Sequence, residues 1–106
     1  MGRDTLGQFE QLVLLAILHL SDGAYAVPII REIEERTGRS VAHAAVYVAL
    51  KRLADRGMVS STLGESTAEQ GGRAKRFYEV EPDAVRRLNE ERVALQAMWD
   101  GLEQTS

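Results

Sequence analysis

The fold of this chain is decided by residues 45–59, whose sequence is AVYVALKRLADRGMV. Apolar residues recur there at i, i+3, i+4 and i+7, as Val46, Ala49, Leu50 and Leu53. This spacing predicts a helix over about residues 42–56 with one buried edge. Gly57 ends the helix, and a strand is predicted over residues 58–63. Further along, residues 71–78 have the sequence GGRAKRFY, which predicts a glycine turn that opens a second, basic strand over residues 73–81.

Two helices are predicted before this block. Thr5 as N-cap and Gln8 three residues later match a capping box, so the first helix is expected to begin there. Residues 12–20 are apolar almost all the way round the helix. Such a helix needs cover on more than one side, which in so small a domain a second subunit would supply. The second helix has Pro28 in its first turn and Gly38 at the left-handed position after its end.

A last helix is predicted over about residues 83–102, after Pro82. Its seam follows a heptad-like spacing interrupted by one arginine: Val85, Leu88, Arg92, Leu95, Trp99 and Leu102. The elements before it, three helices and a two-stranded hairpin, form a winged helix-turn-helix whose third helix enters the major groove of DNA. We therefore expect a mainly α (α+β) fold. A DNA-binding domain would cover residues 1–81, and a dimerisation helix over residues 82–106 would pack on its own domain and on the partner.

Length, charge and cysteine content indicate which classes of function this chain can have. A chain of 106 residues is normally one domain, and its net charge is −3. The charge is segregated: residues 39–76 carry seven Lys or Arg and three Asp or Glu, a net charge of +4, and the remainder carries −7. A local positive field steers a protein onto phosphate. The chain has no cysteine and no apolar run long enough to cross a membrane, so we expect a cytoplasmic protein without membrane attachment.

Residue types needed for catalysis or metal binding are scarce. The chain has two histidines and no cysteine, and neither His19 nor His43 belongs to a recognisable catalytic or metal-binding motif. His19 lies in the apolar first helix, where an interface histidine is expected. We therefore expect no enzyme activity, no metal site and no cofactor.

Taken together, these stretches resemble the PadR family of transcriptional regulators, in its short form with a single C-terminal helix. The resemblance covers the chain from Leu6 to Leu102 and is carried by residues 12–18, 23–25, 29–34, 46–59 and 71–78. It implies a homodimeric, mostly repressing regulator of a palindromic operator, whose last helix packs against the partner's first and last helices. In some relatives, phenolic or flat aromatic effectors bind at the dimer interface. The family's usual serine cap of the third helix is Ala42 here, and its Thr-Pro before the last helix is Glu81-Pro82.

Eight residues are candidates for contacting DNA. They lie on the predicted third helix and on the hairpin, or wing: His43, Ala44, Tyr47, Lys51, Arg52, Arg73, Lys75 and Arg76. The alternative role for Tyr47 is packing between helices. The alternative role for Arg52 is an ion pair with Asp55 or Glu32. Strand alternation places Arg73 and Lys75 on one face of the wing and Arg76 on the other, where Arg76 has a solvated surface position as its alternative.

A second set of residues is expected at the dimer interface. It consists of Leu12, Leu15, Val85, Leu88, Arg92, Leu95, Trp99 and Leu102. Arg92 would pair with Glu90 or Glu91 of the other chain or fix the partner choice of the dimer. Trp99, with Leu95, is a candidate platform for a small aromatic effector, and the alternative for Trp99 is a place in the dimer core.

Three functions remain open from the sequence. The first is a homodimeric DNA-binding regulator, with or without release by an aromatic effector. The second is a winged-helix module for protein–protein contact, which the local positive charge disfavours. The third is an effector-binding dimer with little specific DNA binding.

Overall fold

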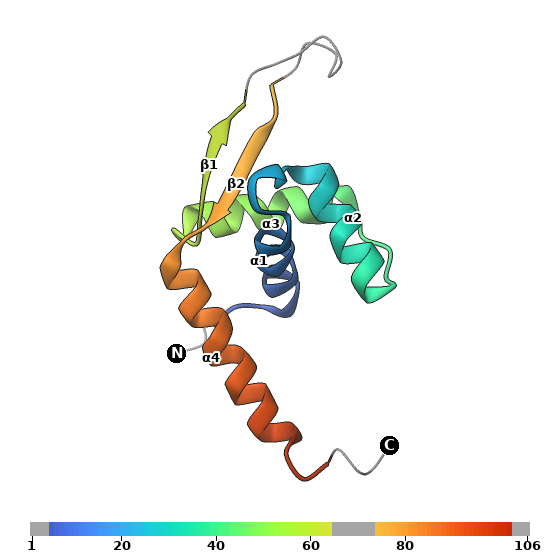
Figure 1. Cartoon of the computed structure of the whole chain (residues 1–106), viewed down its shortest axis with the longest axis vertical. Helices are drawn as coiled ribbons and strands as arrows, with labels where there is room; N and C mark the ends of the chain where they lie inside the picture. The colour runs from blue at the N-terminus through green and yellow to red at the C-terminus, as the bar shows by residue number, and fades with distance from the viewer. Residues whose placement is uncertain (1–4, 65–73, 103–106) are drawn as a thin grey trace.

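The computed structural model describes residues 5–64 and 74–102, and within them the helices and strands occur in the predicted order (Figure 1). They are α1 (Gln8–Leu20), the short 3-10 helix η2 (Ser21–Gly23), α2 (Ala26–Thr37), α3 (His43–Asp55), β1 (Val59–Leu63), β2 (Arg76–Val80) and α4 (Pro82–Trp99). Three helices followed by an antiparallel two-stranded hairpin make a winged helix-turn-helix. The predicted mainly α fold with a small sheet is therefore confirmed.

Helix α1 begins later than the sequence predicts. Its N-cap is Gly7 and not Thr5, so the expected capping box of Thr5 and Gln8 is wrong. The reason is Glu10, whose Oε1 accepts a hydrogen bond from the backbone N–H of Gly7 at 3.2 Å. Gln11 adds a side-chain bond to the carbonyl of Leu6 at 3.0 Å, and the Leu6 side chain is buried in the core. The chain before α1 is thus held extended against the domain.

The core lies where α1, α2 and α3 meet. Its largest fully buried side chains are Leu14, Ile29, Leu50, Leu53, Val13 and Val46. In α2 the side chains of Ile29, Ile30 and Ile33 are all buried and form its core-facing side. Gly38 ends α2 at a φ of 73°, the left-handed conformation that favours glycine, and its N–H donates to the carbonyl of Glu34 at 2.9 Å.

The wing is an antiparallel hairpin in which Val59 pairs with Val80 and Leu63 pairs with Arg76. Strand β2 begins at Arg76 and is shorter than the predicted strand, and Arg73 lies outside the described residues. Two backbone bonds fasten the wing to the rest of the domain. The N–H of Tyr78 donates to the carbonyl of Ala24, just before α2, at 2.9 Å, and the N–H of Met58, just before β1, donates to the carbonyl of Leu53 in α3 at 2.8 Å. The N–H of Glu81 donates to the carbonyl of Met58 at 2.9 Å and continues the hairpin past Val59 and Val80.

Helix α4 leaves the domain as it runs toward the C-terminus (Figure 1). Pro82 occupies its first turn, and Ala84 and Leu88 are buried against the domain. Beyond Leu88 no described residue of the chain is buried. The helix ends at Trp99, so the expected continuation to Leu102 is wrong. The backbone departs from helical geometry at Asp100, and Gly101 adopts a φ of 90°.

Candidate nucleic-acid interface

Helix α3 has the predicted division between a buried and an exposed side. Its buried residues are Val46, Ala49, Leu50 and Leu53, as the spacing predicts. The five candidate DNA contacts on this helix are all exposed: His43, Ala44, Tyr47, Lys51 and Arg52. Helical geometry separates them, since positions three or four residues apart share a side and adjacent positions do not. Tyr47 therefore lies on the flank next to the wing, and Arg52 lies on the flank next to α1.

On the wing flank, α3 and the hairpin enclose a hollow of about 280 Å³. Its lining brings together three of the candidate residues, Tyr47, Lys75 and Arg76, with Tyr25, Ala26, Val27, Ala74 and Tyr78. These residues come from the start of α2, the middle of α3 and the wing. The structure thus gathers a phenol hydroxyl and two cationic side chains beside the exposed side of α3. Hydroxyl, ammonium and guanidinium groups are the donors that bind phosphate oxygens in protein–DNA complexes.

Tyr25 is a member of this hollow that the sequence analysis did not single out. Its ring holds Lys75 in place, because the Nζ of Lys75 lies 4.9 Å from the ring centroid in a cation–π contact. The ring also meets Phe77 edge-to-face at a centroid distance of 5.3 Å. The signal available in the sequence was the stretch Gly23-Ala24-Tyr25, which carries part of the family resemblance but gives no indication that Tyr25 contacts the wing.

Arg76 lies at the end of the wing nearest this hollow. Its Nη1 donates to the Oγ of Ser61 on the neighbouring strand at 3.0 Å, so the guanidinium is oriented across the hairpin while remaining exposed. Burial raises the pKa of the Tyr78 hydroxyl, an effect that the charge of Arg76 partly offsets and that Tyr47 reinforces. Tyr78 is therefore a neutral hydrogen-bonding group near neutral pH, close enough to Arg76 and Tyr47 to interact with both.

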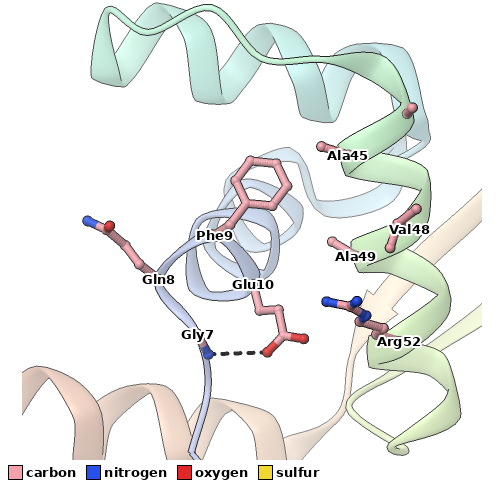
Figure 2. Close-up of a pocket in the computed structure, with 9 residues that line it drawn as sticks. Gly7, Gln8, Phe9, Glu10, Ala45, Val48, Ala49 and Arg52 are labelled. Atoms are coloured by element: carbon pink, nitrogen blue, oxygen red, sulfur yellow. Dashed lines mark hydrogen bonds between the residues drawn. The ribbon is translucent and has the colours of Figure 1, made fainter.

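On the opposite flank, α3 and the start of α1 border an open groove of about 620 Å³. Figure 2 shows Val48 and Arg52 of α3 on one side of it, with Phe9 and Glu10 of α1 on the other. Neither alternative partner of Arg52 is used, because Glu32 pairs with Arg36 and Asp55 pairs with Lys51 at 3.5 Å. Among the described residues, no ion pair of Arg52 is seen.

A separate apolar surface lies between α1 and α4. A groove of about 380 Å³ brings together five of the expected interface residues, Leu15, Val85, Leu88, Arg92 and Leu95, with Gln11, Leu18 and Asn89. Leu15 and Leu18 are 43 % and 44 % exposed, which shows that α1 is uncovered on this side within one chain. The sequence analysis did not single out Leu18, although the uninterrupted apolar run of α1 contained the signal.

The remaining interface candidates lie apart from this groove. Leu12 is half-buried against the core, and Trp99 and Leu102 are exposed beyond it toward the C-terminus. Arg92 donates to Asn89 one turn earlier on the same helix. Leu95 lines the groove between α1 and α4, whereas Trp99 is not among its lining residues, and His19 is exposed on α1.

Over the part of the chain that the structure describes, no cluster of three or more His, Cys, Asp or Glu side chains is placed to bind a metal ion. None of the helices in this part has the length and apolar character needed to cross a lipid bilayer.

The fold and the exposed side of α3 define a winged helix-turn-helix protein whose third helix is free to enter a groove. Comparison with known proteins then gives the family. Residues 14–90 match the transcriptional regulator PadR-like family, and the chain belongs to this family, which confirms the resemblance seen in the sequence. The family is one of transcriptional regulators.

Solved structures share the fold at low sequence identity. A PadR-like transcription factor from Bacteroides fragilis is 23 % identical with a TM-score of 0.75, covering 94 % of this chain and 91 % of that chain. A transcriptional regulator from Clostridium thermocellum is 18 % identical with a TM-score of 0.72, covering 90 % and 89 %. A PadR family regulator from Clostridium difficile is 19 % identical with a TM-score of 0.68, covering 92 % and 97 %. The chain matches none of the curated proteins with which it was compared.

Proposed function

We propose that this protein is a sequence-specific DNA-binding repressor that acts as a homodimer on a palindromic operator. One observation carries the proposal: Tyr47 on the exposed side of α3 lies in one hollow with Lys75 and Arg76 of the wing. Specific binding requires contacts to base edges and contacts to phosphates, and an exposed helix with cationic groups beside it can make both. Base edges are read by the helix, and phosphates are held by the flanking cations.

The eight candidate residues have distinct roles in this proposal. Tyr47, Lys75 and Arg76 hold the phosphate backbone on the wing side, and Arg52 holds it on the side of α1. His43 and Ala44 face the floor of the groove, and Lys51 contacts a phosphate or a base edge. Arg73 belongs to the wing by sequence and lies outside the described residues.

The dimer is supported by the exposed apolar surface between α1 and α4. Leu15, Leu18, Val85 and Leu95 would be covered by the same surface of a partner, as a two-fold interface requires. Trp99 lies at the end of α4 and Leu102 lies beyond it, where the C-terminal ends of the two copies would meet. Residues 1–81 are then the DNA-reading part, and residues 82–106 hold the two copies together. Two recognition helices related in this way address half-sites about one turn of DNA apart.

An aromatic effector is proposed to bind next to Trp99, near the two-fold axis. The supporting observation is that Trp99 is 55 % exposed in the single chain, so its ring is available to a partner or to a ligand. Quenching of Trp99 fluorescence by planar aromatic compounds together with release from DNA is the expected result. Quenching without any change in DNA binding would instead favour an effector-binding dimer.

The experiment that tests the central proposal is selection of bound duplexes from a random DNA library at about 150 mM salt, where non-specific binding is weak. The expected result is a recovered palindrome. A well-folded protein that recovers no preferred sequence would contradict the proposal and favour a winged-helix module that binds another protein.

A further inference from the structure

The exposed side of α3 carries an apolar strip that phosphate contacts do not explain. Ala44, Val48 and Lys51 are four and three residues apart, so they share one side of the helix. That side is opposite to the buried row formed by Val46, Ala49, Leu50 and Leu53. Within α3, Val48 and Tyr47 are the two large apolar side chains that are exposed, Val48 to 50 %. Tyr47 belongs to the hollow on the wing side, whereas Val48 does not.

An exposed valine in the middle of this helix lowers the stability of the helix, and no burial in the core offsets this loss. Its branched side chain loses χ1 freedom in a helix, and its helix propensity is lower than that of alanine, lysine or arginine. Burial in the core would offset this cost, but half of the side chain remains exposed beside the open groove that faces α1. Val48 is therefore explained neither by helix formation nor by the core.

The surroundings of Val48 indicate what covers it. Cationic side chains lie on both flanks of α3, with Lys75 and Arg76 on the wing side and Arg52 on the side of α1. An apolar strip between two cationic flanks matches a major groove, whose rims are phosphates and whose floor is formed by base edges. Thymine is the base that presents a methyl group there. Residues in the N-terminal half of a recognition helix lie nearest the bases, and Ala44 and Val48 lie in that half.

We propose that Val48, with Ala44 beside it, contacts the C5-methyl group of a thymine in each half-site and so makes this protein selective for thymine at that position. The inference rests on the proposed function, since it requires α3 to enter the major groove. It adds a base identity to that function and names Val48 as a specificity-determining residue, which the analysis of charged and polar candidates had missed.

The test uses the full chain and the duplex recovered by selection. Each thymine of the site is replaced in turn by deoxyuridine, which removes the methyl group and keeps base pairing unchanged. Loss of one methyl contact should weaken binding by the wild-type protein about fourfold at one position of each half-site. The variant Val48→Ala should lose most of this preference and bind the thymine and deoxyuridine duplexes with nearly equal affinity at that position. Because each protein is compared with itself on two duplexes, a change in folding stability does not affect the ratio.

Val93→Ala is the matched control, because Val93 is 58 % exposed and lies on α4. It should keep the fourfold preference for the methyl group. The inference is overturned if Val48→Ala also keeps the preference, or if the wild-type protein is insensitive to every replacement within a recovered site. Failure to recover any site overturns the proposed function as well, so the two failures are distinguishable.

Discussion

The Nη1 of Arg56 lies 3.1 Å from the Oε1 of Glu10, which joins the end of α3 to the first turn of α1. The same carboxylate oxygen accepts the N–H of Gly7 at 3.2 Å, and the Nη2 of Arg56 donates to the carbonyl of Thr5 at 3.2 Å. The two side chains are 28 % and 15 % exposed, so solvent screens the pair only in part. One arginine thus fixes the position of the recognition helix relative to the helix that carries the proposed dimer surface.

Replacing Arg56 with methionine should lower the free energy of unfolding by about 1–3 kcal/mol, because the Glu10 carboxylate would lose a charged partner while staying largely buried. Urea unfolding followed by circular dichroism measures the change. Arg86→Met is the control, since Arg86 is 55 % exposed in its ion pairs on α4 and exposed pairs contribute little. Equal losses in the two variants would show that the link between α1 and α3 has no special role.

Ala42→Ser should stabilise the protein. Ala42 is the N-cap of α3 and makes no side-chain capping bond, whereas a serine hydroxyl there can accept an N–H of the first turn, worth about 1 kcal/mol. The midpoint of thermal unfolding should rise. Ala45→Ser, which adds a hydroxyl inside the exposed first turn, should give no such rise. A stabilisation of the same size in both variants would argue against capping as the cause.

Lys51→Ala and Lys75→Ala should each reduce the dependence of DNA binding on salt. If each lysine neutralises one phosphate, the slope of log affinity against log salt concentration falls by about one per variant. Fluorescence anisotropy with the selected duplex at several salt concentrations gives the slope. Arg86→Ala removes the same charge from α4 and should leave the slope unchanged. A double variant of the two lysines with the wild-type slope would show that this docking is wrong.

Leu95→Asp should weaken the proposed dimer by about tenfold or more, because the groove between α1 and α4 would have to bury a carboxylate in each copy. Sedimentation velocity over a range of protein concentrations measures the dissociation constant. Ala94→Asp places the same charge one residue earlier on α4, on an exposed side that does not line this groove, and should change the constant little. A monomeric wild-type protein would remove the basis of the two-fold model.

The sequence was sufficient to predict α3, because its four buried residues follow one helical period. The end of α2 was also predictable, since the left-handed backbone at Gly38 suits glycine. The start of α1 was not. Thr5 and Gln8 match the capping pattern, but Glu10 reaches the backbone of Gly7 and sets the helix start two residues later.

The site was predicted in part, and the missed residues share a cause. Tyr25 enters the hollow because the wing returns to the start of α2, a contact between segments far apart in the sequence. Leu18 and Val48 are ordinary apolar residues by type, and only their exposure in the folded chain separates them from core residues. The apolar run of α1 indicates that some of its side chains need cover, but only the folded chain shows that Leu18 and Val48 are among the uncovered ones.

In the proposed dimer, the second half of α4 would make the lifetime of the protein depend on pairing. A helix of this length is marginal in water without a surface to pack on, and beyond Leu88 the described part of the chain buries no residue of its own. A newly made copy that has not met a partner would therefore expose a fraying segment, which is a preferred site of proteolysis. Paired copies would be protected. Degradation of unpaired copies would then limit the cellular level of the protein. At low concentration, part of any newly made protein would be degraded before it finds a partner, and this fraction would fall as the concentration rises.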